Sequence, residues 1–429
     1  MPYDDVLNEL YGLERFGIKL GLANITELLR RMGNPHHRFR AVHVTGSNGK
    51  GSVCAFIESV LREAGYRTGL YTSPHLIRFN ERIRVGGREI PDEEVVRLFE
   101  MIKPNSAAMA SDSVSKQPTF FETTTAMAFQ YFADNEVDLA VVEVGMGGGM
   151  DATNVVNPET CVLTRISLEH TDHLGKTVKR IAGEKSGILK QGIPAVTLAQ
   201  ETLPVIEERA KELNCPLAVV GRGATYSRVG GNLAEQTIDY SGPPTIRVTT
   251  AMAGAHQAEN AALAIAALFA LESRGWKISD AALRTGIARM RWPARFQLVR
   301  RSPPAVIDGA HNPGGALSLR DSIGEYFPGK KAVFVMGMLM DKDLAEFVGT
   351  IAPLAAHVVA TRPKTERAYP PEDVALAFKK LGISSEVMED VQAAVGRGLS
   401  LASKDRPLFV IGSLYLAGDA LRYFQEGSV

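Results

Sequence analysis

The fold of this chain is decided by the stretch Val42-His43-Val44-Thr45-Gly46-Ser47-Asn48-Gly49-Lys50-Gly51-Ser52, an apolar run followed by a glycine-rich turn and a helical pattern. Such a turn directs backbone N–H groups inward, the helix N-terminus adds partial positive charge, and Lys50 can reach terminal phosphates. The stretch departs from G-x-x-x-x-G-K-[ST], because Val44 replaces the first glycine and Gly51 separates Lys50 from Ser52. A glycine-rich turn with a solvated lysine is the alternative, but the flanking strand and helix favour a phosphate-binding loop.

Apolar runs alternate with helical periodicity along most of the chain, which is typical of βαβ units and of a mostly parallel sheet. An α/β fold is therefore predicted. In the first part of the chain, strands are predicted at 40–45, 68–71, 138–144 and 160–166, and helices at 52–64 and 260–272. A second series of strands is predicted at 305–307, 332–336, 357–361 and 408–411.

Prolines mark a predicted domain boundary. Residues 291–304 contain Trp292-Pro293 and Pro303-Pro304, and prolines at this density break secondary structure. We expect residues 1–294 to form a large α/β domain with a mostly parallel sheet and residues 295–429 to form a smaller α/β domain. Within the first domain, residues 221–248 are rich in Gly and Thr and are expected to form an antiparallel excursion.

Composition excludes several classes of protein. The 48 basic and 48 acidic residues give zero formal net charge, which removes any global attraction to nucleic acid or anionic membranes. The three cysteines, Cys54, Cys161 and Cys215, lack metal-site spacing and are expected to be reduced core thiols. The N-terminus has no apolar signal region, and the longest apolar stretch, 261–271, is shorter than the ~20 residues that span a bilayer. A cytoplasmic protein is expected.

Polar residues follow the predicted strands, at the strand end where open α/β sheets bind ligands. Glu143 ends an apolar strand and is suited to hold Mg²⁺ opposite a phosphate loop. The glycines after it do not form a dinucleotide fingerprint, because Met150 replaces the third glycine. His170 and His173 follow the next strand and could bind a metal or phosphate, or serve a structural role.

Two further segments carry polar residues with open interpretations. Lys185 lies in an otherwise apolar setting, where a salt-bridged surface pair is the ordinary interpretation. Asp308 and His311 flank a glycine-containing turn after a strand of the second domain. That turn is either a ligand-facing loop or an Asx-type turn with a structural histidine.

Taken in order, these segments resemble the Mur ligase superfamily and, within it, the dihydrofolate synthase/folylpolyglutamate synthase family, along essentially the whole chain. The Gly-Lys-Gly-Ser form of the loop and Ser-Pro-His-Leu are more typical of this folate branch than of the peptidoglycan ligases. The motifs that carry the resemblance are TGSNGKGS (45–52), YTSPHL (71–76), RFNERI (78–83), EVGMGG (143–148), DATN (151–154), EKSGI (184–188) and DGAHNP (308–313).

The resemblance implies an ATP-dependent ligase that adds L-glutamate to dihydropteroate, to a reduced folate, or to both. In this family the acceptor carboxylate becomes an acyl phosphate, the glutamate amine attacks it, and ADP and phosphate are released. The two domains are expected to close over a hinge near Arg295 to exclude water. The implied ATP contacts are Asn48, Gly49, Lys50, Gly51, Ser52, Asn260, Arg295 and Asp308.

The resemblance also implies two Mg²⁺ sites and a pterin site. Ser73, Glu143 and His170 match the metal ligands, and a carbamylated Lys185 would hold a second Mg²⁺. Lys50, Lys185 and His311 are the expected catalytic residues, with His311 or a nearby carboxylate taking the amine proton. The pterin segments are Lys19, Leu20 and Gly21; Thr119, Phe120, Phe121 and Glu122; and Met150, Asp151 and Ala152.

Phe121 would stack on the pterin ring and Asp151 would accept its donors, whereas core packing is the alternative for Phe120 and Phe121. Two positions depart from the family pattern. Gly149 stands where relatives usually carry a basic residue, and Glu169 stands where an Asp often precedes the metal histidine.

Two other functions stay open at this stage. One is a Mur-type ligase acting on another carboxylate, such as a peptidoglycan nucleotide precursor or a modified pterin. The other is a nucleotide-dependent switch that hydrolyses ATP without ligating anything. We expect small-molecule partners, no nucleic acid or membrane partner, and a monomer. Which folate reaction is catalysed, and to what glutamate chain length, the sequence leaves open.

Overall fold

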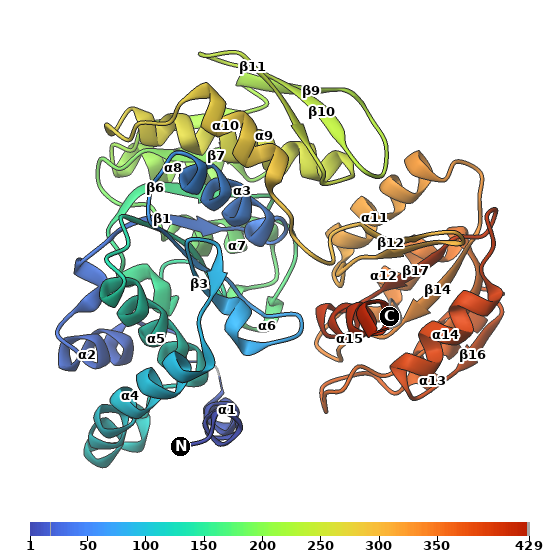
Figure 1. The fold of residues 1–429 in the computed structure, drawn as a ribbon, viewed down its shortest axis with the longest axis horizontal. Helices are drawn as coiled ribbons and strands as arrows, with labels where there is room; N and C mark the ends of the chain where they lie inside the picture. The colour runs from blue at the N-terminus through green and yellow to red at the C-terminus, as the bar shows by residue number, and fades with distance from the viewer. Residues whose placement is uncertain (18, 427–429) are drawn as a thin grey trace.

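Two sheets organise the computed structural model, which describes residues 1–17 and 19–426 (Figure 1). The larger sheet has eleven strands in the order β11-β10-β9-β8-β7-β6-β1-β5-β2-β3-β4, and the smaller has six in the order β12-β13-β17-β14-β15-β16. The predicted two-domain α/β architecture is therefore confirmed. No helix of the described residues is both long and apolar enough to cross a membrane.

The larger sheet is parallel at its centre, where β1 pairs with β5 and β6. At one end, β9, β10 and β11 are antiparallel, as predicted for residues 221–248. The strands are β1 (Arg40–Thr45), β2 (Thr68–Tyr71), β3 (Ile83–Val85), β4 (Arg88–Glu89), β5 (Leu139–Glu143), β6 (Pro158–Leu163), β7 (Ala195–Leu198), β8 (Leu217–Val220), β9 (Gly223–Gly231), β10 (Gln236–Ser241) and β11 (Ile246–Thr250).

Helices cover both faces of this sheet (Figure 1). Val42 and Val44 of β1 pack in one buried cluster with α3 and α9, whereas Ala41 packs in another with α5. This alternation follows from the two-residue period of a strand. The helices are α1 (Tyr3–Gly12), α2 (Ala23–Arg31), α3 (Lys50–Glu63), α4 (Asp92–Asp112), α5 (Phe120–Asp134), α6 (Thr171–Leu174), α7 (Val178–Ser186), α8 (Leu203–Glu212), α9 (Ala255–Glu272) and α10 (Asp280–Arg289).

The second sheet is parallel except for its β12–β13 pair. The chain reaches it between Arg289, where α10 ends, and Gln297, where β12 begins. Its strands are β12 (Gln297–Arg301), β13 (Pro304–Ile307), β14 (Ala332–Met336), β15 (Ala355–Ala360), β16 (Ser385–Val387) and β17 (Leu408–Ile411). Its helices are α11 (Pro313–Tyr326), α12 (Leu344–Ile351), α13 (Pro371–Lys379), α14 (Val391–Leu401) and α15 (Leu414–Glu426).

One predicted strand differs from the structure in a way that matters for the site. The strand predicted at 160–166 is β6, which ends at Leu163. The next residues leave the sheet, and the Arg165 carbonyl accepts hydrogen bonds from the backbone N–H groups of Ser47 (2.8 Å) and Asn48 (3.2 Å). Residues 164–166, which were predicted to end the strand, therefore lie outside β6, and Arg165 hydrogen-bonds the glycine-rich turn.

Candidate active site

The turn between β1 and α3 has the backbone of an anion-binding loop. Gly49 has φ +91°, and a β-carbon there would overlap the amide of Asn260 on α9. Glycine is thus required both for the turn and for the close approach of α9. The Lys50 ammonium donates to the carbonyls of Gly46 (2.9 Å) and Ser47 (3.3 Å), so it lies over the loop.

A cavity of about 210 Å³ lies beside this loop, between the two domains. All eight residues predicted to contact ATP line it, although they come from β1–α3, α9 and the second domain. Ser73, Glu143, His170 and His311 line it too. The eight are Asn48, Gly49, Lys50, Gly51, Ser52, Asn260, Arg295 and Asp308.

The second domain fixes its side of this cavity with short hydrogen bonds. The Asp308 carboxylate accepts from the backbone N–H of Phe296 (2.7 Å) and of Ala310 (2.8 Å). Asn312 donates to the Asn48 side-chain oxygen at 3.0 Å, which joins the second domain directly to the glycine-rich turn. Burial lowers the pKa of Arg295.

Ser73, Glu143 and His170 line the same cavity, and Glu143 contacts Ser73. Glu143 is 5% exposed, and its carboxylate accepts from the Ser73 backbone N–H at 3.1 Å. Burial raises the pKa of Glu143, and the nearby Lys50 ammonium opposes that rise. Burial lowers the pKa of His170 to about 4, so its imidazole is neutral at pH 7. A buried carboxylate and a neutral imidazole that line the same cavity are donors of the kind that suit a cation.

This donor set is sparse. Among residues 1–17 and 19–426 there is no group of three or more His, Cys, Asp or Glu side chains that could hold a metal ion. Mg²⁺ usually keeps several waters and binds through one or two carboxylates together with substrate phosphates. Ser73, Glu143 and His170 fit a Mg²⁺ that arrives with the nucleotide rather than one held by the protein alone.

Lys185 lies beneath the glycine-rich turn. It is 1% exposed, and its ammonium lies 2.7 Å from the Glu169 carboxylate and donates to the Gly46 carbonyl at 2.8 Å. The interpretation as a surface pair is therefore wrong, because α7 carries this side chain into the domain interior. Burial opposes ionisation of Glu169, but Lys185 and Lys50 outweigh it and lower the pKa of Glu169 to about 2.

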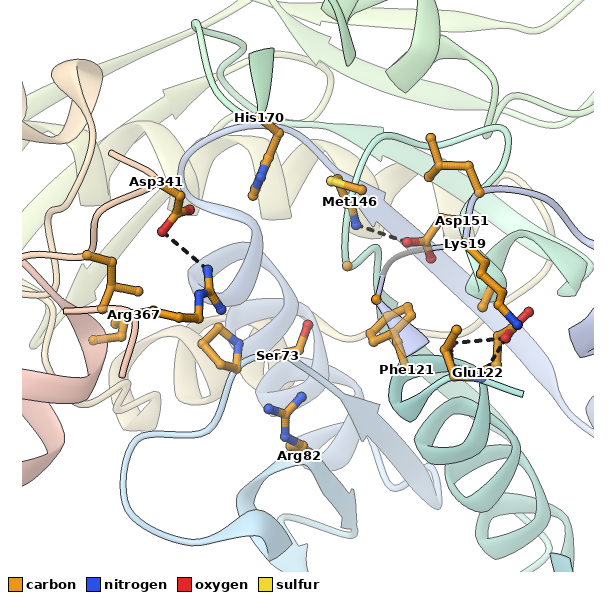
Figure 2. A pocket seen from close by; sticks show the side chains of 18 of the residues that line it. Lys19, Ser73, Arg82, Phe121, Glu122, Met146, Asp151, His170, Asp341 and Arg367 are labelled. Atoms are coloured by element: carbon orange, nitrogen blue, oxygen red, sulfur yellow. Dashed lines mark hydrogen bonds and ion pairs between the residues drawn. The ribbon is translucent and has the colours of Figure 1, made fainter. Parts of the chain in front are cut away.

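A second cavity, of about 340 Å³, adjoins the first (Figure 2). Eight of the ten residues predicted to contact the pterin line it: Lys19, Leu20, Thr119, Phe121, Glu122, Met150, Asp151 and Ala152. Gly21 and Phe120 lie outside the lining. Gly21 donates its N–H to the Met150 carbonyl at 3.0 Å, and Phe120 stacks on Tyr11 with ring centroids 5.8 Å apart.

The two neighbouring phenylalanines therefore have different surroundings. Phe121 faces the cavity in Figure 2, and a β-carbon at Gly145 would lie 2.5 Å from its ring. Phe120 is not among the lining residues, and the guanidinium of Arg82, which does line the cavity, lies 5.2 Å from its ring centroid. Both rings pack against the same core cluster, but only Phe121 of the two also lines the cavity.

The second domain lines the far side of this cavity with residues that the sequence reasoning missed. Figure 2 shows Asp341 and Arg367 across the cavity from Phe121 and Lys19. The Asp341 carboxylate lies 3.2 Å from Arg367 and 3.0 Å from Lys342. Two cations and one carboxylate thus face the space. Their signal in the sequence is the position of Asp341 and Lys342 just after the strand predicted at 332–336.

His256 and Gln257 were also missed. Both lie at the start of α9 and line the cavity beside the glycine-rich turn. Among the described residues, the Nδ1 of His256 and the Nε2 of Gln257 have no hydrogen-bond partner. Gln257 accepts from Asn260 at 3.1 Å, three residues along the helix. The i, i+3 spacing to Asn260 is the signal that could have found it.

The Mur ligase middle domain model matches residues 44–268, and the model of the Mur ligase glutamate ligase domain matches residues 294–414. The fold and the interdomain site are thus those of a Mur ligase, a class of ATP-dependent ligases. The dihydrofolate synthase/folylpolyglutamate synthase of Bacillus subtilis is 39% identical over 359 residues, which cover 82% of this chain and 83% of that protein. The chain belongs to the dihydrofolate synthase/folylpolyglutamate synthase family.

Solved structures agree with this assignment. The Mycobacterium tuberculosis folylpolyglutamate synthase complexed with ADP has a TM-score of 0.91 and 31% identity, over 98% of this chain and 99% of that one. The Escherichia coli protein FolC in complex with DHPP and ADP has a TM-score of 0.88 and 29% identity, over 99% of this chain and 98% of that one.

Proposed function

We propose that this protein uses ATP to join L-glutamate to dihydropteroate, to a reduced folate, or to both, and releases ADP and phosphate. The observation that carries this proposal is the junction of the two cavities. Ser73, His170 and His311 line both the cavity beside the glycine-rich turn and the one that contains Phe121. A terminal phosphate and an acceptor carboxylate that entered from the two sides would meet there.

The chemistry follows from that meeting point. An acceptor carboxylate oxygen attacks the terminal phosphorus and ADP leaves; the glutamate nitrogen then attacks the acyl carbon, loses a proton and expels phosphate. Lys50 would stabilise negative charge on the transferring group. Mg²⁺ held by Ser73, Glu143 and His170 would neutralise phosphate charge. The site lies between two domains, so closure about a hinge near Arg295 would exclude water from the acyl phosphate.

We propose that His311 accepts the amine proton through its neutral imidazole, which burial makes a weaker base than a free histidine side chain. Burial lowers its pKa to about 4, so the ring is neutral at pH 7. Its Nδ1 lies 2.7 Å from the Gly309 carbonyl, which requires Nδ1–H and leaves the lone pair on Nε2.

We propose that Lys342 and Arg367, which line the second cavity, bind the carboxylates of L-glutamate, with Asp341 near its amino group.

Replacing Lys342 by alanine removes one charged donor, a contribution of about 1.5–3 kcal/mol, so KM for L-glutamate is expected to rise about 10- to 100-fold. Initial rates at varied glutamate check this, with the exposed Lys379→Ala variant as the matched control. An unchanged KM for glutamate would show that this carboxylate binds elsewhere.

We further propose that Lys185 works as a carbamate. Its nitrogen would add to CO₂, forming an N–C bond and releasing a proton, and the anionic product would hold a second Mg²⁺. Burial supports this, because it lowers the pKa of Lys185 and so favours the neutral amine that reacts.

Lys185→Ala should lose most of its turnover and should regain part of it in millimolar acetate or formate, because a small carboxylate can occupy the space of the carbamate. The measurement is turnover against carboxylate concentration, with wild type as the control. Full activity of the variant without added carboxylate would contradict this role.

The acceptor is identified by product analysis. Mass spectrometry of reactions with ATP, Mg²⁺ and L-glutamate would compare dihydropteroate with tetrahydrofolate. Addition of glutamate to dihydropteroate alone defines a dihydrofolate synthase, and addition to both defines a bifunctional enzyme. Addition to neither, with intact nucleotide binding, would direct the search to another carboxylate.

A further inference from the structure

A buried chain of hydrogen bonds ends at Asp151. Asp151 is 5% exposed and lies beside Phe121 in the second cavity, which we call the acceptor cavity (Figure 2). One carboxylate oxygen accepts from the Thr153 N–H (2.9 Å) and from the Thr153 hydroxyl. The other accepts from the Met146 N–H at 2.9 Å. The Thr153 hydroxyl also lies 2.9 Å from Nε2 of His43, a residue of the central strand β1.

The proton positions in this chain follow from the donors available. A threonine hydroxyl has one proton, and an ionised carboxylate can only accept. Because the Thr153 hydroxyl gives its proton to Asp151, it must accept at its other side, so His43 carries its proton on Nε2. Burial and Lys190 lower the pKa of His43 to about 3, which keeps the ring neutral and fits this arrangement.

His43 is an unusual residue for its position. It is 0% exposed at the centre of the larger sheet, and its Nδ1 has no hydrogen-bond partner among the described residues. An apolar side chain of similar size would avoid this desolvated nitrogen. The contact that His43 does make leads through Thr153 to the acceptor cavity.

We propose that His43 is a positioning residue for acceptor binding, acting through Thr153 on the Asp151 carboxylate; this rests on the proposed pterin site. By donating to the Thr153 hydroxyl, His43 fixes the rotation of that hydroxyl so that its proton points at Asp151. Burial raises the pKa of Asp151, and the Thr153 and Met146 hydrogen bonds oppose this rise. The chain thus holds the Asp151 carboxyl group in one orientation for the ring donors of the substrate.

Four variants test this inference by kinetics with dihydropteroate. His43→Met removes the donor and keeps an apolar side chain of similar length, so KM for dihydropteroate is expected to rise about fivefold, while KM for ATP and the melting temperature stay near wild type. His43→Gln keeps an N–H donor at similar reach and should restore KM. In the Thr153→Val background, His43→Met should have no further effect, because the chain is already broken.

Three results would overturn the proposed role of His43. The first is an unchanged KM for dihydropteroate in His43→Met. The second is additive effects of His43→Met and Thr153→Val on that KM. The third is a melting temperature that falls together with kcat in every variant. The Asp151→Asn variant distinguishes a failure of the His43 proposal from a failure of the proposed pterin site. If Asp151→Asn leaves KM for dihydropteroate unchanged, the acceptor site itself is misassigned.

Discussion

Lys50→Ala is expected to keep its fold and to lower kcat about a thousandfold or more, because a positioned charge that stabilises the transferring phosphoryl group is typically worth this much. Lys50 begins α3, where alanine is well tolerated, and the hydrogen bonds of its ammonium go to the loop carbonyls of Gly46 and Ser47. The loss should therefore appear in turnover and not in stability.

Single-turnover phosphate release and thermal melting, measured on the same preparations, separate the two effects for Lys50→Ala. Lys379→Ala removes an exposed lysine from the second domain and should match wild type in both. Near-normal turnover of Lys50→Ala would exclude the phosphate-loop interpretation.

Glu143→Gln is expected to lower kcat about a hundredfold or more and to weaken the response to Mg²⁺, because the amide keeps the shape but loses the charge that a cation needs. The amide oxygen can still accept from the Ser73 N–H. Since burial already disfavours the carboxylate, its neutral replacement should melt at an unchanged or higher temperature.

Glu159→Gln is the matched control, because it should change the melting temperature but not kcat. Glu159 is also buried, but it is paired with Arg274 at 2.9 Å and with Arg40 at 3.5 Å. It lies at the start of β6, whereas the site lies at the opposite, carboxyl end of the parallel strands. Breaking these pairs should lower the melting temperature and leave kcat intact. If Glu143→Gln retained turnover within a few fold, Glu143 would not hold the catalytic metal.

The sequence predicted most of the strands that carry the site, because the position of a polar residue just after an apolar run already places it at the ligand-binding end of a sheet. The Gly-Lys-Gly loop after β1 and Glu143 at the end of β5 are examples. The same reasoning suggested that Asp308 lies in a ligand-facing loop, but only the folded chain brings Asp308 to the same cavity as Asn48.

What the sequence could not predict depends on packing between distant segments. The local pattern around Lys185 suggested a surface pair, although the resemblance implied a metal-binding role, because helical spacing alone does not say which face of α7 is buried. The Asn312–Asn48 hydrogen bond, the cations Lys342 and Arg367, and the chain from His43 to Asp151 each join residues far apart in sequence. Phe120 and Phe121 are a further example, since both pack against the same core but only Phe121 lines the second cavity.

The most direct test is ADP formation by the wild-type protein with Mg²⁺ and ATP, with and without L-glutamate, and with dihydropteroate, tetrahydrofolate or no acceptor. A ligase should form ADP in step with glutamylated product, and only when glutamate and a folate acceptor are both present. ADP formation at the same rate without glutamate or acceptor would identify a nucleotide hydrolase or switch and would contradict the account.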